Sequence, residues 1–504
     1  MPEPTLLRPG DFIDGRFVSP APIDGELAVH SPADQNDRVS LHPFGLSHVD
    51  PAVQSARVAL RGWRRTPATE RRSLLQRYRS RLRANRLVIA ETIMREAGKP
   101  RWEAEGEVSA MIGKVGLCLG EAAELTATRV LSDLPGEIRY RPLGVIAVVG
   151  PFNFPGHLPN GQIVPALLLG NTVVHKPSEK TPSTGTWMAR CFEEAGLPSG
   201  VFNLVQGPAP VAVALVQHPD LDAILFTGSA AVGKRIVQAN IERPERLIAL
   251  ELGGKNASIV LDDCDIEAAA RQIAFAGYVT AGQRCSATSR VIATQRVAER
   301  LRKRIGDIAS RIHVGYPGDP DVFMGPMISK EARAALADVG RRAEAHGFEP
   351  APAGGELSVE GRNGWYVRPS LHLAPNPNAI FPGYTDEELF GPDMVLYTVS
   401  DLDEAIELAN ATRYGLVASV YTGSRERFEQ AANELDTGVL HWNRSTAGAS
   451  GRLPFGGIKQ SGNHRPAGLT TGLSCSYAQG VLLAPRQEPL ASWPGFNADS
   501  RLGS

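Results

Sequence analysis

The sequence predicts an α/β protein whose main framework is a doubly wound, mostly parallel sheet. Short β-rich runs alternate with helical segments from about residue 144 onward, which is typical of βαβ units. The chain has 504 residues, more than the roughly 250 to 300 that one hydrophobic core usually supports, so we expect two large domains. Ligands of such sheets bind in the crevice beyond the carboxyl ends of the strands.

A helical region precedes the alternating strands and helices. Residues 50–120 have a helical pattern, and the GKP motif at 98–100 is a break between two helices. The stretch 71–86 is rich in arginine, but apolar residues lie between the arginines at helical spacing: Leu74, Leu75, Tyr78 and Leu82. This favours an amphipathic helix with a solvated face over a nucleic-acid-binding segment.

Strands and helices then alternate. The pattern predicts strands over 144–149, 172–176, 201–205 and 223–226, and helices over 157–169, 182–195, 209–217 and 229–239. A second series begins with β-rich runs at 249–254 and 257–261. It continues with helices over 265–277 and 291–311, a strand over 394–399 and a helix over 401–410. The Gly- and Pro-rich stretch 350–366 predicts a surface excursion or a hairpin.

Composition excludes several classes of function. The formal net charge is −1, which gives no electrostatic footprint for nucleic acid or an anionic membrane. No run approaches the roughly 18 apolar residues of a membrane helix, and the first residues show no signal-peptide pattern. The 5 cysteines are odd in number and scattered, which favours a reducing cytoplasm. We expect a cytoplasmic protein with no nucleic-acid or membrane partner.

The stretch GSAAVGKR, residues 228–235, is close to the phosphate-binding loop of nucleotide triphosphatases. A predicted strand runs directly into it and a helix follows, so a phosphate could bind at the helix N-terminus. Arg235 stands where an ATP site needs a hydroxyl to hold magnesium, and the spacing of Gly-x-Gly-x-x-Gly is also missing. From these residues alone, a glycine turn without a ligand remains an equal alternative.

Other motifs decide between these alternatives: GPFNFPGHLPNGQIVPALLLGNTVVHKPSE (150–179), LELGGKN (250–256), GQRCSATSR (282–290), EELFGP (387–392) and PFGGIKQSG (454–462). Their order and spacing resemble those of the aldehyde dehydrogenase superfamily over residues 10–485. The resemblance implies that the pyrophosphate of NAD(P) lies along the loop, and ATP is rejected. The loop residues are Gly228, Ser229, Ala230, Ala231, Val232 and Gly233.

The resemblance also implies a domain organisation. A Rossmann-type cofactor domain would comprise 1–120 and 143–250, and an α/β catalytic domain 251–445. A small bridging β-sheet used in oligomerisation would comprise 121–142 and 446–490, with an edge strand in LSCSYAQGVLLA, and 491–504 would be a C-terminal tail. Relatives of this kind are homodimers or homotetramers, and we expect one of the two.

Three residues are implied to carry the chemistry. Aldehyde oxidation by hydride transfer needs a nucleophile that first adds to the carbonyl, and the resemblance assigns this to Cys285. Its thiol, with an ordinary pKa of about 8.5, should be partly ionised near neutral pH, and Arg284 is a candidate to assist. The amide of Asn153 and the backbone N–H of Cys285 would stabilise the oxyanion. Glu251 would be the base that activates water against the thioester, which argues against CoA-acylating relatives.

The cofactor contacts follow the same resemblance. Lys176 and Glu179 would reach the adenosine ribose, where a carboxylate suits two hydroxyls and repels a 2′-phosphate, so NAD is favoured over NADP. Glu388 and Phe390 would hold the nicotinamide ribose and the surroundings of the ring, and Phe152 belongs to the same set. No metal is expected.

Two further segments bear on the substrate. FPGHLPNG (154–161) and SGNHRPAG (461–468) are similar to segments of succinylglutamic semialdehyde dehydrogenases of bacterial arginine catabolism. This similarity implies a dicarboxylated aldehyde, N-succinyl-L-glutamate 5-semialdehyde, oxidised to N-succinyl-L-glutamate. Such a substrate needs cationic partners remote from Cys285. Four candidates are left open: His157, Arg444, His464 and Arg465.

Several alternatives remain open. CSATSR departs from the segment expected of that branch of the family, and Ser286 resembles glutamate semialdehyde dehydrogenases. The substrate could therefore be glutamate semialdehyde or a general aldehyde. Outside this reaction class, the alternatives are a cysteine esterase and a non-catalytic structural protein.

Overall fold

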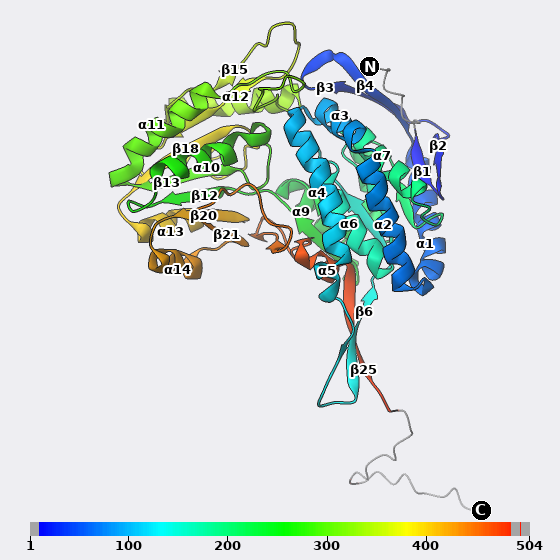
Figure 1. Ribbon diagram of the computed structural model, residues 1–504. Coiled ribbons are helices and arrows are strands. Elements are labelled where there is room, and N and C mark those ends of the chain that lie inside the picture. The colour runs from blue at the N-terminus through cyan, green and yellow to red at the C-terminus, as the bar shows by residue number, and fades with distance from the viewer. Residues whose placement is uncertain (1–9, 485–493, 495–504) are drawn as a thin grey trace, which may run out of the picture.

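Two seven-stranded sheets covered by helices organise the chain, and a thin antiparallel sheet projects away from them (Figure 1). The computed structural model describes residues 10–484 and residue 494. The expected C-terminal tail, 491–504, lies outside the described residues except for residue 494, and so do residues 485–490 of the expected bridging segment. Both large sheets are mostly parallel, which confirms the predicted α/β class.

The first sheet has the strand order β11-β10-β7-β8-β9-β1-β2. Its strands are β1 (Asp11–Ile13), β2 (Arg16–Val18), β7 (Val145–Val149), β8 (Thr172–Lys176), β9 (Phe202–Leu204), β10 (Ala223–Thr227) and β11 (Leu247–Glu251). From β7 the chain passes through β8 and β9 on one side, then returns to place β10 and β11 on the other. The order therefore reverses between β7 and β10, where a doubly wound sheet binds its ligand.

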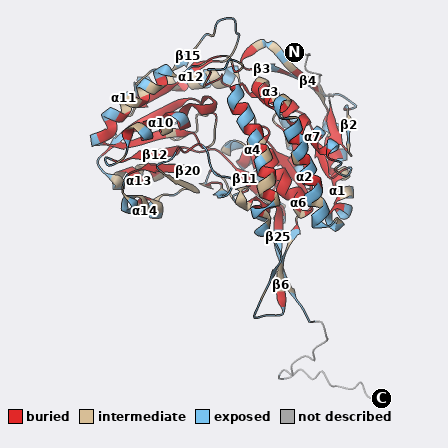
Figure 2. Ribbon diagram, viewed as in Figure 1, coloured by how far each residue is buried: buried red, intermediate tan, exposed pale blue. Residues whose placement is uncertain are grey.

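Alternate residues of the strands pack against helices on opposite faces of this sheet. Ile146 and Val148 join one cluster with α2, α3, α4, α6 and α7, whereas Val145, Ala147 and Val149 join another with α1, α8 and α9. The bounds are α1 (Val49–Arg65), α2 (Ala68–Ala84), α3 (Arg86–Ala97), α4 (Arg101–Leu119), α6 (His157–Leu169), α7 (Pro182–Glu194), α8 (Ala209–Gln217) and α9 (Ala230–Ala239). Figure 2 shows the strands buried and the outer faces of the helices exposed.

Two predictions about the helical region are confirmed. In α2 the apolar residues between the arginines are buried, and the Tyr78 ring stacks on Phe192 of α7 with ring centroids 3.8 Å apart. The helix α3 ends at Gly98, whose φ of +71° is a left-handed conformation that favours glycine. The GKP motif therefore separates α3 from α4 as expected.

The second sheet has the order β14-β17-β18-β13-β12-β20-β21. Its strands are β12 (Asn256–Val260), β13 (Thr288–Thr294), β14 (Glu349–Pro350), β17 (Ser370–Leu373), β18 (Asp393–Val399), β20 (Val417–Tyr421) and β21 (Val439–Trp442). The helices α10 (Ile266–Tyr278) and α11 (Gln295–Arg311) cover one face. The other face is covered by α12 (Lys330–Ala345), α13 (Leu402–Asn410) and α14 (Arg425–Glu434).

The helix predicted over 291–311 is wrong at its start. Residues 291–294 belong to β13, an inner strand of the second sheet, and α11 begins only at Gln295. Val291 and Ile292 are β-branched and fully buried, on opposite faces of the strand. A short apolar run directly before an amphipathic helix fits the helical pattern and is assigned to that helix. Only the β-branched residues indicate a strand instead.

The projecting sheet pairs β25 (Ser476–Leu482) with β6 (Gly136–Pro142) and β6 with β5 (Arg129–Val130). The edge strand expected in LSCSYAQGVLLA is thus β25, while the domain boundaries themselves stay a prediction.

Smaller elements are α5 (Glu121–Glu124), the hairpin β3 (Gly25–Ser31) with β4 (Asp34–Phe44), and the pair β15 (Gly355–Glu356) with β16 (Val367–Arg368). Two more pairs are β19 (Tyr414–Gly415) with β23 (Ile458–Lys459), and β22 (Pro454–Phe455) with β24 (Ala467–Gly468). Short 3-10 turns are η1 (Leu46–His48), η2 (Val279–Gly282) and η3 (Leu469–Cys475). None of the described helices is both long and apolar enough to cross a membrane.

Candidate active site

The motifs singled out in the sequence meet at the carboxyl edge of the first sheet. The segment with Phe152 and Asn153 follows β7, and the loop that starts at Gly228 follows β10. Lys176 is the last residue of β8 and Glu251 the last of β11. Neighbouring parallel strands all end at the same edge of a sheet. The sheet therefore brings together residues that are separated by nearly 100 positions in the sequence.

The nucleophile candidate lies on a strained loop from the second half of the chain. Thr280 and Ala281 have φ values of 58° and 51°, which are left-handed conformations unusual for residues with a Cβ. Gly282 continues this turn with φ +66°, and a Cβ there would overlap the backbone of Gly391. The turn aims the following segment, which ends at Cys285, into the cleft between the two sheets.

Polar contacts hold this loop in place. Arg284 Nε donates to Thr280 Oγ1 at 2.6 Å, and Arg284 Nη2 donates to Glu103 of α4 at 2.9 Å. Asn256 Nδ2 donates to the carbonyl of Cys285 at 2.7 Å. The geometry of the loop is therefore fixed by residues from α4 and β12 as well as by its own turn.

Cys285 and Glu251 line one cavity of about 280 Å³. The cavity lies between α6, α4 and the loops 448–451 and 466–468, and Phe154 and His157 also face it. Asn153 is buried beside it and donates its amide to the carbonyl of Gln283 at 2.9 Å. The structure thus brings the three predicted catalytic residues to one place, with a nucleophile and a carboxyl group in the same cavity.

The expectation that the Cys285 thiol is partly ionised near neutral pH is wrong for this structure. Burial raises the pKa of Cys285 to about 12, and the carboxylates of Glu251 and Glu388 raise it further, while Arg284 opposes them. Arg284 is not free to neutralise a thiolate fully because its guanidinium is paired with Glu103. The thiol is protonated at neutral pH, so a base must accept its proton as it reacts.

Glu251 has the properties of such a base. Burial raises the pKa of its carboxyl well above 4.5, and the charge of Arg465 partly offsets this. Its Oε1 is buried without a hydrogen-bond partner among the described residues. Gly456, from the PFGG motif, makes room for it, because a Cβ at that position would lie 2.5 Å from Oε1. A carboxyl group kept unpartnered in a cavity is suited to exchange protons.

The loop from Gly228 to Gly233 has the shape of a phosphate site. It leaves β10, and the Ser229 hydroxyl caps α9 by accepting from Val232 N–H at 3.4 Å. Gly233 is buried, and a Cβ there would lie 2.8 Å from the Leu252 side chain, so glycine allows the helix to approach β11 closely. Ala230, Ala231 and Val232 form the first turn of α9, and the N–H of Val232 is the one taken up by the Ser229 cap.

The remaining cofactor candidates surround this crevice. Lys176 Nζ donates to the carbonyl of Pro177 and lies 3.9 Å from the half-exposed carboxylate of Glu179. Burial lowers the pKa of Lys176 to about 8. Glu388 accepts from Gly254 N–H at 3.0 Å, and burial raises its pKa to about 7.

Two aromatic rings stand beside these polar groups. Phe390 has φ 53° and its ring meets that of Phe152 edge to face, with centroids 5.8 Å apart. Phe152 comes from the segment after β7 and Phe390 from the EELFGP motif, so this contact joins the two halves of the chain.

The four substrate candidates are not equivalent. His157 lines the cavity, whereas Arg444 is exposed and does not. His464 and Arg465 are exposed on a turn with φ values of 52° and 46°. Among them, only Arg465 acts on a candidate catalytic group, through the pKa of Glu251.

Sequence reasoning missed Lys114, which lies on α4 and lines the cavity. It also missed Glu103, which accepts from Arg284. Both lie on the buried face of α4, which carries no recognisable motif, so only the packing of that helix could have revealed them.

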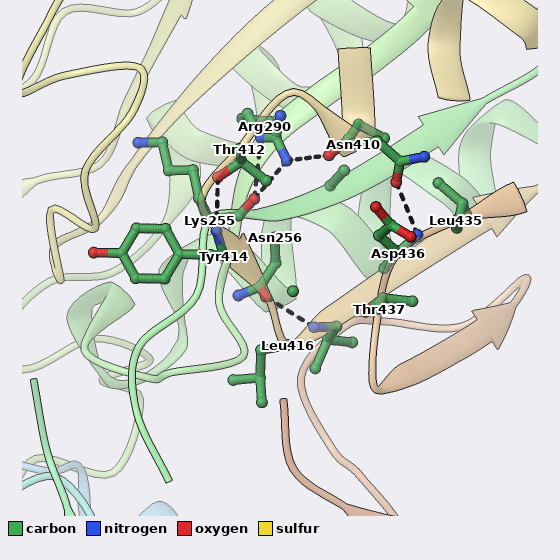
Figure 3. Close-up of a pocket in the computed structure, with 15 residues that line it drawn as sticks. Lys255, Asn256, Arg290, Asn410, Thr412, Tyr414, Leu416, Leu435, Asp436 and Thr437 are labelled. Atoms are coloured by element: carbon green, nitrogen blue, oxygen red, sulfur yellow. Dashed lines mark hydrogen bonds between the residues drawn. The ribbon is translucent and has the colours of Figure 1, made fainter. Parts of the chain in front are cut away.

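A smaller cavity of about 20 Å³ is lined by residues that include Asn256, Arg290 and Tyr414 (Figure 3). Asn256 Oδ1 accepts from Val417 N–H at 3.1 Å, while its amide holds the carbonyl of Cys285. The buried Arg290 donates to the carbonyls of Lys255 and Ala409 at 2.8 Å. This space is large enough only for water, and Asn256 is the residue of its wall that bonds to the nucleophile loop.

Comparisons with known proteins agree with this geometry. Residues 17–479 match the aldehyde dehydrogenase family. The chain is 39% identical over 471 residues to N-succinylglutamate 5-semialdehyde dehydrogenase of Chromobacterium violaceum, covering 92% of this chain and 95% of that protein.

Solved structures are similar over nearly the whole chain. NAD-dependent aldehyde dehydrogenase from Sinorhizobium meliloti has a TM-score of 0.90 at 31% identity, with 96% of each chain covered. A mutant of Thermus thermophilus 1-pyrroline-5-carboxylate dehydrogenase has a TM-score of 0.87 at 30% identity, covering 94% of this chain and 92% of that one. With its motifs gathered around one cavity and its similarity extending from end to end, this chain belongs to the aldehyde dehydrogenase family.

Proposed function

We propose that this protein oxidises N-succinyl-L-glutamate 5-semialdehyde to N-succinyl-L-glutamate with NAD as the cofactor. The observation that carries the reaction type is the placement of Cys285 and Glu251 on one cavity at the carboxyl edge of the first sheet. The substrate is supported by the 39% identity to a relative of that name from Chromobacterium violaceum.

The first step joins Cys285 Sγ to the aldehyde carbon. The thiol starts protonated, so its proton passes to a base as the C–S bond forms, and Glu251 is the carboxyl group in the same cavity. The oxyanion that results needs donors. Asn153 uses one amide N–H for the carbonyl of Gln283 and has a second to offer. The N–H of Cys285 has no acceptor among the described residues and is the other donor.

The second step converts the thioester to product. Loss of hydride from the tetrahedral carbon leaves an acyl group on Cys285 Sγ. Glu251 first releases the thiol proton to solvent and then takes a proton from water. The hydroxide adds to the thioester, the C–S bond breaks, and the proton of the carboxylic acid passes to the thiolate, which releases the carboxylate and restores the thiol. Burial of Glu251 favours this role, because a raised pKa makes the carboxylate a stronger base.

The residues of the crevice fit NAD. The N–H groups at the start of α9 suit a pyrophosphate, and the exposed carboxylate of Glu179 suits ribose hydroxyls rather than a 2′-phosphate. Glu388 keeps a carboxylate oxygen for the second ribose, and Phe152 and Phe390 supply apolar walls. When bound, NAD accepts the hydride. Lys176 and Glu179 would hold its adenosine end and Glu388 its nicotinamide end.

Glutamate semialdehyde is the second candidate substrate. It is favoured by the TM-score of 0.87 to a 1-pyrroline-5-carboxylate dehydrogenase and by Ser286 after the nucleophile. This candidate also carries a carboxylate, so both substrates require an anionic group to be accommodated in the cavity.

We further propose that the chain forms a homodimer, which could pair into a homotetramer. The projecting sheet supports this because it exposes apolar side chains far from either core, including Val130 and Leu482, with exposed fractions of 72% and 75%. The cytoplasmic location stays a prediction from cysteine usage.

The test is NADH formation by the purified protein with three aldehydes: N-succinylglutamate 5-semialdehyde, glutamate semialdehyde and hexanal. Cys285→Ala is the blank. A strong preference for the succinylated aldehyde that disappears in the blank supports the proposal. Equal rates on all three aldehydes would support the proposed reaction but contradict the proposed substrate. If none of them gave NADH, the esterase or structural alternatives would be favoured.

A further inference from the structure

Lys114 is a buried cation without a counter-ion among the described residues. It lies on α4, its exposed fraction is 7%, and it lines the cavity that holds Cys285. Its Nζ donates to the carbonyl of Gly468, and no described Asp or Glu pairs with it. An ammonium group has three N–H donors, so two of them remain without an acceptor in the described part of the chain.

The neighbouring buried cations are all compensated. Lys99 lies 2.7 Å from Glu107, and Arg284 lies 2.9 Å from Glu103. Lys114, by contrast, faces only the thiols of Cys118 and Cys475 and the ring of His157. Burying a charge without a partner is expensive. Of these three buried cations in and beside the cavity, Lys114 is the one without a carboxylate partner among the described residues.

The other groups on the cavity wall do not cancel this charge. Burial, and then the charge of Lys114, lower the pKa of His157 to about 4, so its ring is neutral at neutral pH. Glu251 lines the same cavity, but the charge that acts on its carboxyl is that of Arg465, and no ion pair joins it to Lys114. Among the described lining residues, the ammonium of Lys114 is therefore a cation without a carboxylate partner.

The local packing directs this ammonium into the cavity. The helix α4 packs beside α6, where Gly161 has no side chain, and a Cβ there would lie 3.5 Å from Lys114 Cε. His157 lies one helical turn earlier on the same face of α6, and both residues line the cavity. The stem of Lys114 is thus enclosed by helices, with its charged end toward the space that would receive a substrate.

We propose that Lys114 binds a carboxylate of the aldehyde substrate and thereby selects aldehydes that carry an acid group away from the reacting carbon. This inference rests on the proposed oxidation of an aldehyde at Cys285. An ion pair with hydrogen bonds supplies the two missing acceptors. It also compensates a buried charge, so an aldehyde without a carboxylate leaves that charge unpaired and binds less well.

A purely structural role makes a different prediction. If Lys114 served only to hold the Gly468 carbonyl beside the cavity, its loss would disturb the wall for every substrate. The activities toward anionic and uncharged aldehydes would then fall together, and the melting temperature with them.

The experiment compares Lys114→Met with wild type and with Lys303→Met. Methionine keeps the length of the stem and removes the charge, and Lys303 is an exposed residue of α11 that makes the matched substitution outside the site. The value of kcat/KM is measured for N-succinylglutamate 5-semialdehyde and for hexanal. The dissociation constant of the product, N-succinylglutamate, is measured by calorimetry, which does not depend on turnover.

For Lys114→Met we expect kcat/KM with the anionic aldehyde to fall about 10- to 100-fold, the range for losing a hydrogen bond to a charged group. The product should bind more weakly by a similar factor, hexanal should change by less than about threefold, and Lys303→Met should match wild type. Lys114→Arg, which keeps the charge, should recover part of the loss. Equal losses on both aldehydes, or no loss on either, would overturn the inference.

Failure of the proposed function is distinguishable from failure of this inference. If wild type forms no NADH from any aldehyde but its affinity for N-succinylglutamate depends on Lys114, the carboxylate site stands and the oxidation does not. If hexanal and the succinylated aldehyde are oxidised and Lys114→Met binds the product as wild type does, the oxidation stands and Lys114 is not its carboxylate partner.

Discussion

Gly253→Ala tests the cofactor role of Glu388 without touching Glu388. A Cβ at position 253 would lie 2.7 Å from Glu388 Oε1 and closer still to Oε2 and Cδ. The obstacle is the end of a flexible side chain, so the carboxylate moves and the backbone stays. The cost to the fold is one hydrogen bond, the one that Glu388 accepts from Gly254 N–H at 3.0 Å, worth about 0.5–1.5 kcal/mol.

The effect on NAD should be larger than the effect on stability. A carboxylate displaced from the nicotinamide ribose loses roughly 1 to 2 kcal/mol of binding, a factor of about 5 to 30. We therefore expect KM for NAD to rise by that factor at saturating aldehyde, with KM for the aldehyde unchanged. The assays are NADH formation over a range of NAD concentrations and calorimetric titration with NAD.

The control is Gly62→Ala in α1, where a Cβ meets nothing within 4 Å. This substitution should leave the kinetics unchanged and stabilise the helix by roughly 0.5–1 kcal/mol. Wild-type affinity for NAD in Gly253→Ala would refute the role of Glu388. A large drop in its melting temperature would show instead that the backbone, not the carboxylate, absorbs the overlap.

Three further predictions concern ionisable groups. Glu251→Gln should lose about 10²- to 10⁴-fold in kcat, the usual contribution of a general base, and should also form its first NADH slowly, because Glu251 accepts the thiol proton in the first step. Rapid mixing would follow the first NADH; a wild-type burst of one NADH per subunit would limit Glu251 to the second step, and wild-type steady-state turnover would contradict both roles. The thiol of Cys285 should be alkylated by iodoacetamide at a rate that keeps rising beyond pH 9, because its pKa is about 12. Mass spectrometry would follow the reaction, and a plateau near pH 8 would disprove the raised pKa. Glu96 is buried and accepts from the N–H groups of Ser183 and Thr184 at the start of α7. Burial raises its pKa from 4.5 to about 7, so the folded state binds more protons than the unfolded state between these values. The stabilisation that Glu96 gives the folded state is complete below about pH 4.5, and roughly 3 kcal/mol of it is lost as pH rises through about 7. The melting temperature should therefore fall less steeply with pH in Glu96→Gln than in wild type. The same slope in both proteins would contradict the raised pKa of Glu96.

Much of the first sheet could be predicted from sequence because its strands are short apolar runs followed at once by polar motifs. The runs that end at Val149, Lys176 and Thr227 are buried on both faces, so their composition alone marks them. The second sheet was harder to predict. Val291 and Ile292 stand directly before an amphipathic helix, and the helical period of that helix hides the strand.

The residues of the candidate active site also differ in how well the sequence predicts them. Cys285, Glu251 and Asn153 lie in motifs with glycine or proline at fixed spacing, which sequence reasoning detects. Lys114 and Glu103 have no such signal, because their roles depend on how α4 packs against α6 and the nucleophile loop. Glu103 and Arg284 are separated by 181 positions, and a single sequence does not report that two such distant charges meet.

The protonation states of the two reacting groups follow from the burial that creates the cavity. Desolvation raises the pKa of both Cys285 and Glu251, and each neutral form costs less to bury than its ion. Their charges also oppose one another, since a carboxylate at Glu251 makes the thiolate less favourable. When the thiol proton passes to Glu251, the carboxyl becomes neutral, so it no longer repels the thiolate that attacks the aldehyde. The same carboxyl must then lose that proton before it can act on water. The charge of Arg465 lowers the pKa of Glu251, so it favours the carboxylate form that both steps require.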